Sequence, residues 1–129
     1  MTYGVCFIEA GLPVPSRIDE LLKCCGLEVW TPDVVGADDG HIYNGALCMV
    51  IDMPREAGFR TFRLFRDHAV ETPVLLVVDP GLEKALGGLD PRWGLEVVSR
   101  DCDPREILRR VEKLCRKRHQ PVHNERLSA

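Results

Sequence analysis

Short apolar runs alternate along the chain with segments of helical periodicity. Five of these runs are short and mostly apolar, which predicts strands, and those without a polar residue are expected to be covered on both faces. The predicted strands span residues 5–8, 27–30, 46–51, 73–78 and 95–98. The run over 73–78 is the bulkiest and is therefore expected near the centre of a parallel sheet.

The segments between the strands predict helices. Ile18, Leu21, Leu22 and Cys25 recur on one helical face, with Ser16 as the expected N-cap and Gly26 as the stop. The remaining predictions are helices over 55–69, over 82–89 and from Pro104 onward, and a loop with a short helix over 32–44.

This alternation of strands and helices predicts a doubly wound, five-stranded parallel α/β fold of the flavodoxin-like class. Residues 1–118 are expected to form one domain, and residues 119–129 a flexible C-terminal tail or linker. Ligands of such folds bind beyond the carboxyl ends of the strands. Any chemistry is therefore expected near Glu9, Asp52, Asp79 and Arg100.

Composition and charge exclude several classes of function. The chain has 129 residues, of which 45% are hydrophobic and 29% charged, and a net charge of −3, which fits an ordered domain with no general attraction to nucleic acid. No apolar run is long enough to span a membrane, and the N-terminus lacks a signal pattern, so a cytoplasmic location is expected.

No cofactor, metal or enzymatic activity is predicted. The chain contains neither a dinucleotide-binding glycine fingerprint nor a phosphate-binding loop. The six cysteines form no Cys-x-x-Cys pair and are expected to be reduced, although Cys24 and Cys102 stay open as redox sites. His119 and His123 stand four residues apart without an obvious third ligand.

Three segments carry a resemblance to a known family. They are Ile8-Glu9-Ala10, the run from Met53-Pro54 to Gly58, and Thr72-Pro73 with the strand that follows. In this order they resemble the receiver domains of two-component response regulators, especially the FixJ/LuxR type. The resemblance spans about Gly4 to Leu114 and implies a CheY-like (βα)5 fold.

In that family, two acids after the first strand bind Mg²⁺, and an Asp at the end of the third strand accepts a phosphoryl group. A Ser or Thr ends the fourth strand, and a Lys ends the fifth. Here the acidic pair becomes Glu9-Ala10, and counting back from Met53 without a gap places Val50 at the acceptor position. Val78 replaces the hydroxyl residue. Arg100 falls at the Lys position, with Ser99 and Asp101 one residue to either side.

These departures imply a degenerate phosphorylation site and a pseudo-receiver that signals without phosphorylation. One alternative is an atypical acceptor at Asp52, two residues beyond Val50, with Glu9 and Asp79 helping to hold Mg²⁺. Another is an acidic pocket that binds a cation without phosphorylation. A third is that these carboxylates bond backbone N–H groups, or that Asp52 pairs with Arg100.

The expected activity is recognition of a regulatory protein or of a second copy of the chain. The resemblance places the partner face on the fourth helix, the fifth strand and the fifth helix. The candidate contact residues are Trp93, Arg105, Arg109 and Lys113. A basic helix face can also be simply solvated. No helix-turn-helix is present, so direct DNA binding is not expected, and another flavodoxin-like protein with a small-ligand pocket remains a further alternative.

Overall fold

The computed structural model describes residues 4–32, 40–86 and 94–119. Its strands are β1 (Gly4–Glu9), β2 (Glu28–Trp30), β3 (Cys48–Asp52), β4 (Val74–Val78) and β5 (Leu95–Ser99). Its helices are α1 (Ile18–Cys24), α2 (Gly40–Asn44), α3 (Ala57–Asp67), α4 (Leu82–Leu86) and α5 (Pro104–His119). The strands form one sheet in the order β2-β1-β3-β4-β5, with every neighbouring pair parallel. The predicted fold class is confirmed.

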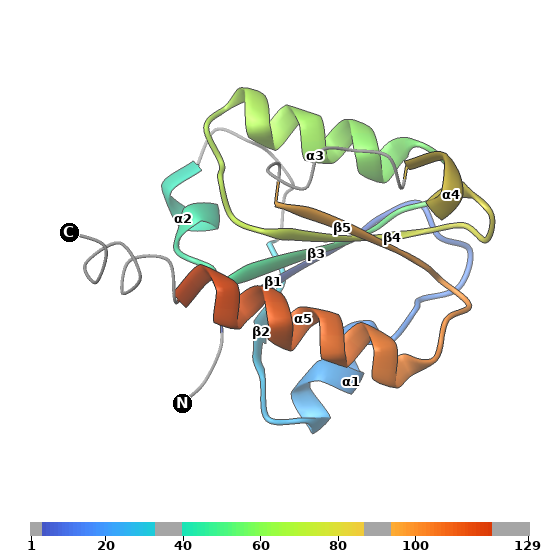
Figure 1. Cartoon of the computed structure of the whole chain (residues 1–129), viewed down its shortest axis with the longest axis horizontal. Coiled ribbons are helices and arrows are strands. Elements are labelled where there is room, and N and C mark those ends of the chain that lie inside the picture. The colour runs from blue at the N-terminus through green and yellow to red at the C-terminus, as the bar shows by residue number, and fades with distance from the viewer. Residues whose placement is uncertain (1–3, 33–39, 87–93, 120–129) are drawn as a thin grey trace.

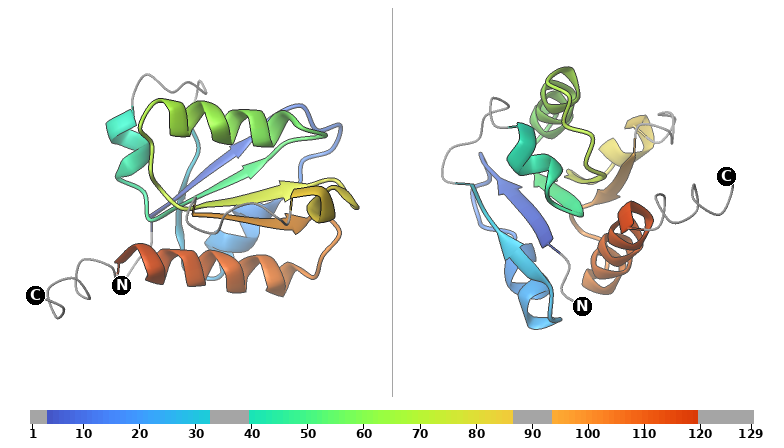
Figure 2. Two further views of the ribbon diagram at one scale, coloured as in Figure 1. Left: turned by 45° about the horizontal axis from the view of Figure 1, so that its top comes forward. Right: turned by 90° about the vertical axis from the view of Figure 1, so that its left-hand side faces the viewer.

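Helices cover both faces of the sheet. Figures 1 and 2 show α1 and α5 on one face, and α2, α3 and α4 on the other. The two central strands, β3 and β4, are buried along their whole length. This explains why their sequences, apart from Asp52 at the end of β3, are apolar rather than alternating.

Alternate residues of the central strands face two separate cores. Val50 and Leu75 pack with the apolar sides of α1 and α5. Ile51 and Leu76 pack on the opposite face with Phe62 and its neighbours from α3. A shift of one residue in any strand would exchange these two cores, so the packing fixes the register.

The start of α1 differs from the sequence prediction. The N-cap position is Arg17, in a left-handed conformation with φ of +61°, and no side chain caps the helix. The prediction that Ser16 caps it is therefore wrong, because its polar groups are bonded elsewhere. The prediction for the other end is confirmed: Gly26, with φ of +87°, follows the helix in the left-handed region that glycine tolerates.

Helix α3 starts close against the sheet at Gly58. A β-carbon at this position would lie 2.6 Å from a methyl carbon of Leu76, which is fully buried in β4. The glycine that ends the Met-Pro-x-x-x-Gly segment therefore has a packing reason, since no larger residue fits without moving the core.

The last helix begins at Pro104, as predicted, and continues through His119, which is the first residue of the predicted tail. Trp93, His123, the end of the helix predicted over 82–89, and most of the loop predicted over 32–44 lie outside the described residues. Among the residues that are described, none of the helices has the length and apolar character needed to cross a lipid bilayer.

Candidate functional site

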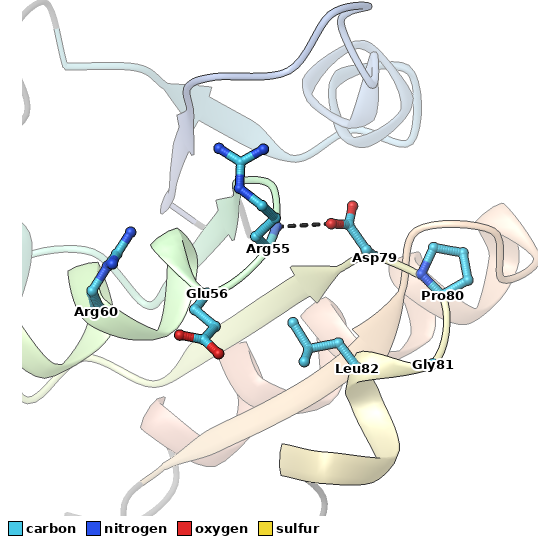
Figure 3. Close-up of a pocket in the computed structure, with 7 residues that line it drawn as sticks. All are labelled: Arg55, Glu56, Arg60, Asp79, Pro80, Gly81 and Leu82. Carbon is cyan, nitrogen blue, oxygen red and sulfur yellow. Dashed lines mark hydrogen bonds between the residues drawn. The ribbon is translucent and has the colours of Figure 1, made fainter.

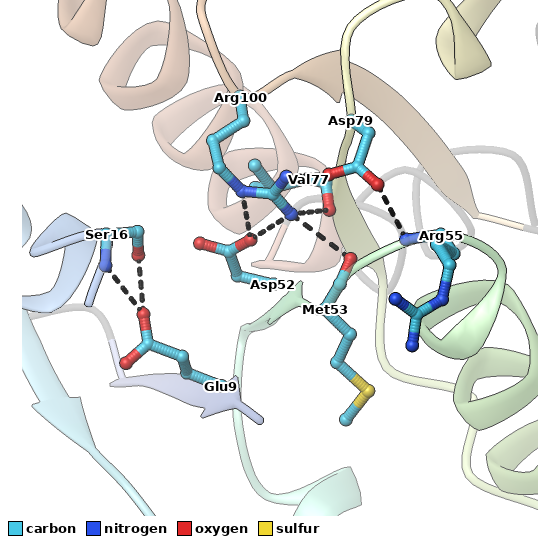
Figure 4. A network of polar contacts seen from close by, with 8 residues as sticks. All are labelled: Glu9, Ser16, Asp52, Met53, Arg55, Val77, Asp79 and Arg100. Atoms are coloured by element: carbon cyan, nitrogen blue, oxygen red, sulfur yellow. Dashed lines mark hydrogen bonds and ion pairs between the residues drawn. The ribbon is translucent and has the colours of Figure 1, made fainter. Parts of the chain in front are cut away.

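The carboxyl ends of the central strands bring four charged side chains together. Glu9 ends β1 and is paired in register with Asp52, which ends β3. Asp79 and Arg100 are the first residues after β4 and β5. Figure 4 shows Asp52 and Asp79 pointing toward Arg100. This is the edge at which the sequence predicted the site.

The central contact is an ion pair between Asp52 and Arg100. The side chain of Asp52 is fully buried, whereas that of Arg100 is 23% exposed. The Nε and Nη2 groups of Arg100 donate to Asp52 Oδ1 at 3.0 and 2.7 Å. The Nη2 group also donates to the carbonyl oxygens of Met53 and Val77 at 3.1 and 3.5 Å. A guanidinium thus neutralises the buried carboxylate.

Asp79 binds the same guanidinium from the other side. Its Oδ1 accepts a hydrogen bond from Arg100 Nη1, and its Oδ2 accepts one of 2.8 Å from the backbone N–H of Arg55. Arg55 has φ of +54°, a conformation that non-glycine residues adopt at a cost of about 1–2 kcal/mol. The turn at Arg55 directs this N–H toward Asp79.

The contacts shift two ionisation equilibria. The Arg55 N–H lowers the pKa of Asp79, and Arg100 acts in the same direction, against the opposing effect of burial. Burial alone would lower the pKa of Arg100, but its bonds to Asp52 and Asp79 outweigh burial, and the pKa is raised. Arg100 is therefore a permanent cation at this edge.

Glu9 is bonded on its own side of the site. Its Oε2 accepts hydrogen bonds of 2.8 Å from both the backbone N–H and the hydroxyl of Ser16. Ala10, the next residue, is exposed and carries no carboxylate. The three carboxylates thus have the partners of the third alternative in the sequence analysis. Glu9 and Asp79 accept a hydrogen bond from a backbone N–H, and Asp52 pairs with Arg100.

The apolar residues of the candidate site lie in the core. Val50 is fully buried two residues inside β3, so the end of that strand is Asp52 and not Val50. The predicted strand stopped at Ile51, but the parallel pairing of Asp52 with both Glu9 and Val77 extends it. Val78 is 1% exposed and offers no hydroxyl.

One polar atom of the site has no partner. Asp52 Oδ2 is buried and makes no hydrogen bond within the described structure. The same part of the chain contains no cluster of three or more Asp, Glu, His or Cys residues that could hold a metal ion. Within the described structure, the cation that pairs with Asp52 is the guanidinium of Arg100.

Two cavities lie beside the site. An open one of about 570 Å³ is lined by the turn before α3 and the loop before α4 (Figure 3). Asp79 borders this cavity, whereas Arg100 borders a second one of about 250 Å³ between the starts of α1 and α5. Asp52 lines neither of the two, so neither gives a small molecule access to its carboxylate.

The basic residues expected on the partner face project from α5. Arg105 is 89% exposed, Arg109 61% and Lys113 50%. Each has an acidic neighbour: Asp103 for Arg105, Glu106 for Arg109 and Glu96 for Lys113. On this face of the helix, each of the three basic side chains is therefore paired with an acidic one, and the face is not purely basic.

Sequence reasoning missed two parts of this network. It assigned Ser16 to a helix cap, whereas both of its polar groups bind Glu9 seven residues earlier. It also gave no role to the Arg55 backbone. No periodicity marks a left-handed turn at an arginine, but the neighbouring Pro54 was a signal for a turn.

Comparisons with known proteins agree with this architecture. No protein-family model and no curated protein sequence matches the chain. One similar solved structure is the signal receiver domain of a protein described as a Luxo repressor from Vibrio parahaemolyticus. It has a TM-score of 0.68 and 13% identity, over 97% of this chain and 98% of that one.

Two further structures are similar. A transiently phosphorylated "switch" in bacterial signal transduction has a TM-score of 0.65 and 14% identity, over 92% of this chain and 99% of that one. A response regulator receiver protein from Sinorhizobium medicae WSM419 has a TM-score of 0.61 and 13% identity, over 91% of this chain and 97% of that one.

The architecture is therefore the CheY-like doubly wound parallel sheet. More narrowly, the chain has the fold of response-regulator receiver domains, and the resemblance found in the sequence is confirmed at that level.

Proposed function

We propose that this chain is a receiver-type signalling module that works without phosphorylation and acts by binding a regulatory protein or a second copy of itself. The observation that carries this proposal is the ion pair between buried Asp52 and Arg100. It occupies the position where a receiver of the ordinary kind needs a reachable carboxylate and a divalent cation.

The first argument concerns access. A phosphoryl donor must approach a carboxylate oxygen in line, with its negative charge shielded by cations. Asp52 has no exposed surface, and Arg100 holds one of its two oxygens with two hydrogen bonds. Its other oxygen is also buried. Phosphorylation of this carboxylate would require Arg100 to leave.

The second argument is the energy of that departure. Arg100 would give up charge-assisted bonds to Asp52 and Asp79 and its bond to the Met53 carbonyl oxygen. Hydrogen bonds to charged groups contribute about 1.5–3 kcal/mol each. Nothing at Val78 offers a hydroxyl to hold the incoming phosphoryl oxygens, and Ala10 offers no metal ligand.

The third argument concerns what remains for signalling. Helix α4 buries none of its residues, and four of the five residues of β5 are only half-buried. With α5 they form a surface of exposed charged side chains such as Arg109 and Lys113. Charged residues at the rim of an interface contribute mainly to specificity and association rate. This surface is the proposed partner face.

Incubation with a small phosphodonor tests the first half of the proposal. The chain is treated with acetyl phosphate and Mg²⁺, and its intact mass is measured. We expect no added phosphoryl mass. A phosphoryl group that maps to Asp52, and that an Asp52→Asn variant fails to acquire, would establish the atypical acceptor in place of this proposal.

Charge reversal tests the second half. Arg109→Glu combined with Lys113→Glu should disrupt self-association, measured by light scattering, or capture of a regulatory partner from the source cell. Arg63→Glu, at an exposed position of α3, is the matched control and should leave both unchanged. If the control and the α5 variant behave alike, the partner face is not on α5.

A further inference from the structure

The larger cavity beside the site combines charged and apolar side chains. It has a volume of about 570 Å³ and lies between the turn that leads into α3 and the loop that leads into α4. Figure 3 shows Arg55 and Arg60 on the α3 side of the cavity, and Pro80 and Leu82 on the opposite side. Cavities of about 300–1,000 Å³ hold small organic ligands. This cavity is therefore large enough for a ligand with several functional groups.

The two arginines of the cavity are exposed and lack anionic partners. Among the described residues, neither guanidinium makes a hydrogen bond or an ion pair, and Arg55 donates only through its backbone N–H, to Asp79. Arg60 follows Glu56 by four residues, a spacing at which acidic and basic side chains commonly pair on a helix. In Figure 3 both guanidinium groups instead extend away from the Glu56 carboxylate. They are therefore available to an anion from outside the chain.

The basic residues of α5 make the opposite arrangement. Arg109, for example, is paired with Glu106 and would have to give up that contact to bind another anion. Arg55 and Arg60 give up no contact with a described residue. The N-terminus of α3 also borders the cavity through Glu56, and the dipole of a helix favours negative charge at that end. The α3 side of the cavity is thus suited to an anionic group.

We propose that this cavity binds a nucleoside monophosphate, with the phosphate group held between Arg55 and Arg60. A phosphate monoester carries a charge of about −1.5 to −2 at pH 7, which matches two guanidinium groups. Guanidinium groups also bind phosphate oxygens through pairs of parallel hydrogen bonds. This inference goes beyond the proposed function, because the cavity is separate from α5 and does not include Asp52.

The remaining lining suits the sugar and the base of such a ligand. Glu56 and Asp79 present carboxylate oxygens, which accept hydrogen bonds from ribose hydroxyl groups. Each oxygen of Asp79 already accepts one hydrogen bond and has the capacity for another. Pro80 and Leu82 offer apolar surface against which a flat base can pack. Inorganic phosphate would leave this half of the cavity unused, and a nucleoside would leave the arginines unpaired.

The acidic residues of the lining oppose the phosphate only weakly. Asp79 is bonded to Arg100, which offsets its negative charge. The carboxylate of Glu56 points away from the two guanidinium groups (Figure 3). The attraction of the phosphate for Arg55 and Arg60 therefore exceeds its repulsion by these acids. Because the cavity is open to solvent, added salt should screen this attraction and weaken binding.

The experiment is an amide NMR titration of the ¹⁵N-labelled full chain with adenosine 5′-monophosphate in buffer without Mg²⁺. We expect saturable shifts at Arg55, Gly81 and Leu82, with a dissociation constant of about 1 mM or lower. The intact mass of the protein should stay unchanged, since this ligand does not phosphorylate carboxylates. The result is therefore independent of whether Asp52 accepts a phosphoryl group.

Variants locate the phosphate. Arg60→Gln and Arg55→Gln should each weaken binding by about tenfold, the effect of losing one charge-assisted hydrogen bond. Arg63→Gln is the matched control, because Arg63 is an exposed arginine of the same helix that does not line the cavity. It should leave the affinity unchanged. If Arg55→Gln disturbs the left-handed turn at that residue, Arg60→Gln, within the regular helix, decides alone.

Two further ligands test the chemical class. Inorganic phosphate and adenosine should each bind at least about tenfold more weakly than adenosine 5′-monophosphate, because each uses only one side of the cavity. Three results would overturn the proposal. The first is the absence of saturable shifts with adenosine 5′-monophosphate. The second is an affinity that Arg60→Gln leaves unchanged. The third is equal binding of inorganic phosphate or adenosine, since the cavity would then not recognise the whole nucleotide.

Discussion

Replacing Arg100 by methionine should destabilise the protein through its effect on Asp52. The variant keeps an apolar stem of similar length but removes the charge that neutralises the buried carboxylate. Loss of one partner from a fully buried ion pair costs about 3–5 kcal/mol. Because Arg100 is 23% exposed, water can enter the vacated space. We therefore expect a loss of about 2–3 kcal/mol in the free energy of unfolding.

Urea denaturation followed by circular dichroism measures this loss. With a typical dependence of about 1–3 kcal/mol per molar of urea, the midpoint should fall by about 0.7–3 M. Arg105→Met is the matched control, since its ion pair with Asp103 is exposed and should contribute less than about 1 kcal/mol. Adding Asp52→Asn to Arg100→Met removes the unpaired charge and should recover at least half of the loss.

Two outcomes would refute this reasoning. If the free energy of unfolding of Arg100→Met lies within about 0.5 kcal/mol of that of the parent protein, the guanidinium is not needed to stabilise the buried carboxylate. If the double variant is no more stable than the single variant, the loss arises from packing of the arginine stem and not from the charge.

Three further predictions concern packing, pH and surface charge. Gly58→Ala should destabilise the fold by about 1–3 kcal/mol in urea denaturation, because its β-carbon would meet Leu76, whereas Gly4→Ala, with open space around it, should have little effect. Since the pKa of Asp79 is lowered in the folded protein, its carboxylate stabilises the fold above the unfolded value of about 3.9 and loses this contribution as pH falls through the folded value. Asp79→Asn should therefore lower the urea midpoint at pH 6 and have little effect near pH 2; an equal effect at both would contradict the assignment. Arg109→Glu should change the salt dependence of self-association or partner binding more than Arg63→Glu, as read from light scattering or binding isotherms at two ionic strengths.

Much of the fold could be predicted because its central strands, β3 and β4, are buried on both faces. Runs such as 73–78 are apolar throughout, and their alternation with helical segments leaves few topologies. Helix ends were predictable where backbone geometry demands a particular residue, as at Gly26 and Pro104. Ser16 was misassigned because serine is a common N-cap residue, whereas here its hydroxyl donates a hydrogen bond to Glu9 instead.

The site was harder to predict because it depends on the length of one loop. Counting back from Met53-Pro54 assumes a loop of fixed length after β3, and it placed Val50 at the acceptor position. The strand continues to Asp52, so the turn to Pro54 is two residues shorter than that count assumes. The pairing of Asp52 with Arg100 joins residues 48 positions apart, and only the sheet register brings them together.

The most direct test of the central claim is an amide NMR titration of the ¹⁵N-labelled protein with Mg²⁺ and then beryllofluoride, which mimics a phosphorylated aspartate. If Arg100 already occupies the cation position of a carboxylate that no donor reaches, the resonances of Asp52, Glu9 and Asp79 should not shift saturably. Arg100→Met serves as the comparison, because it frees the carboxylate. Saturable shifts in the unmodified protein that begin at Asp52 and spread to α5 would contradict the account and identify Asp52 as a working phosphoacceptor.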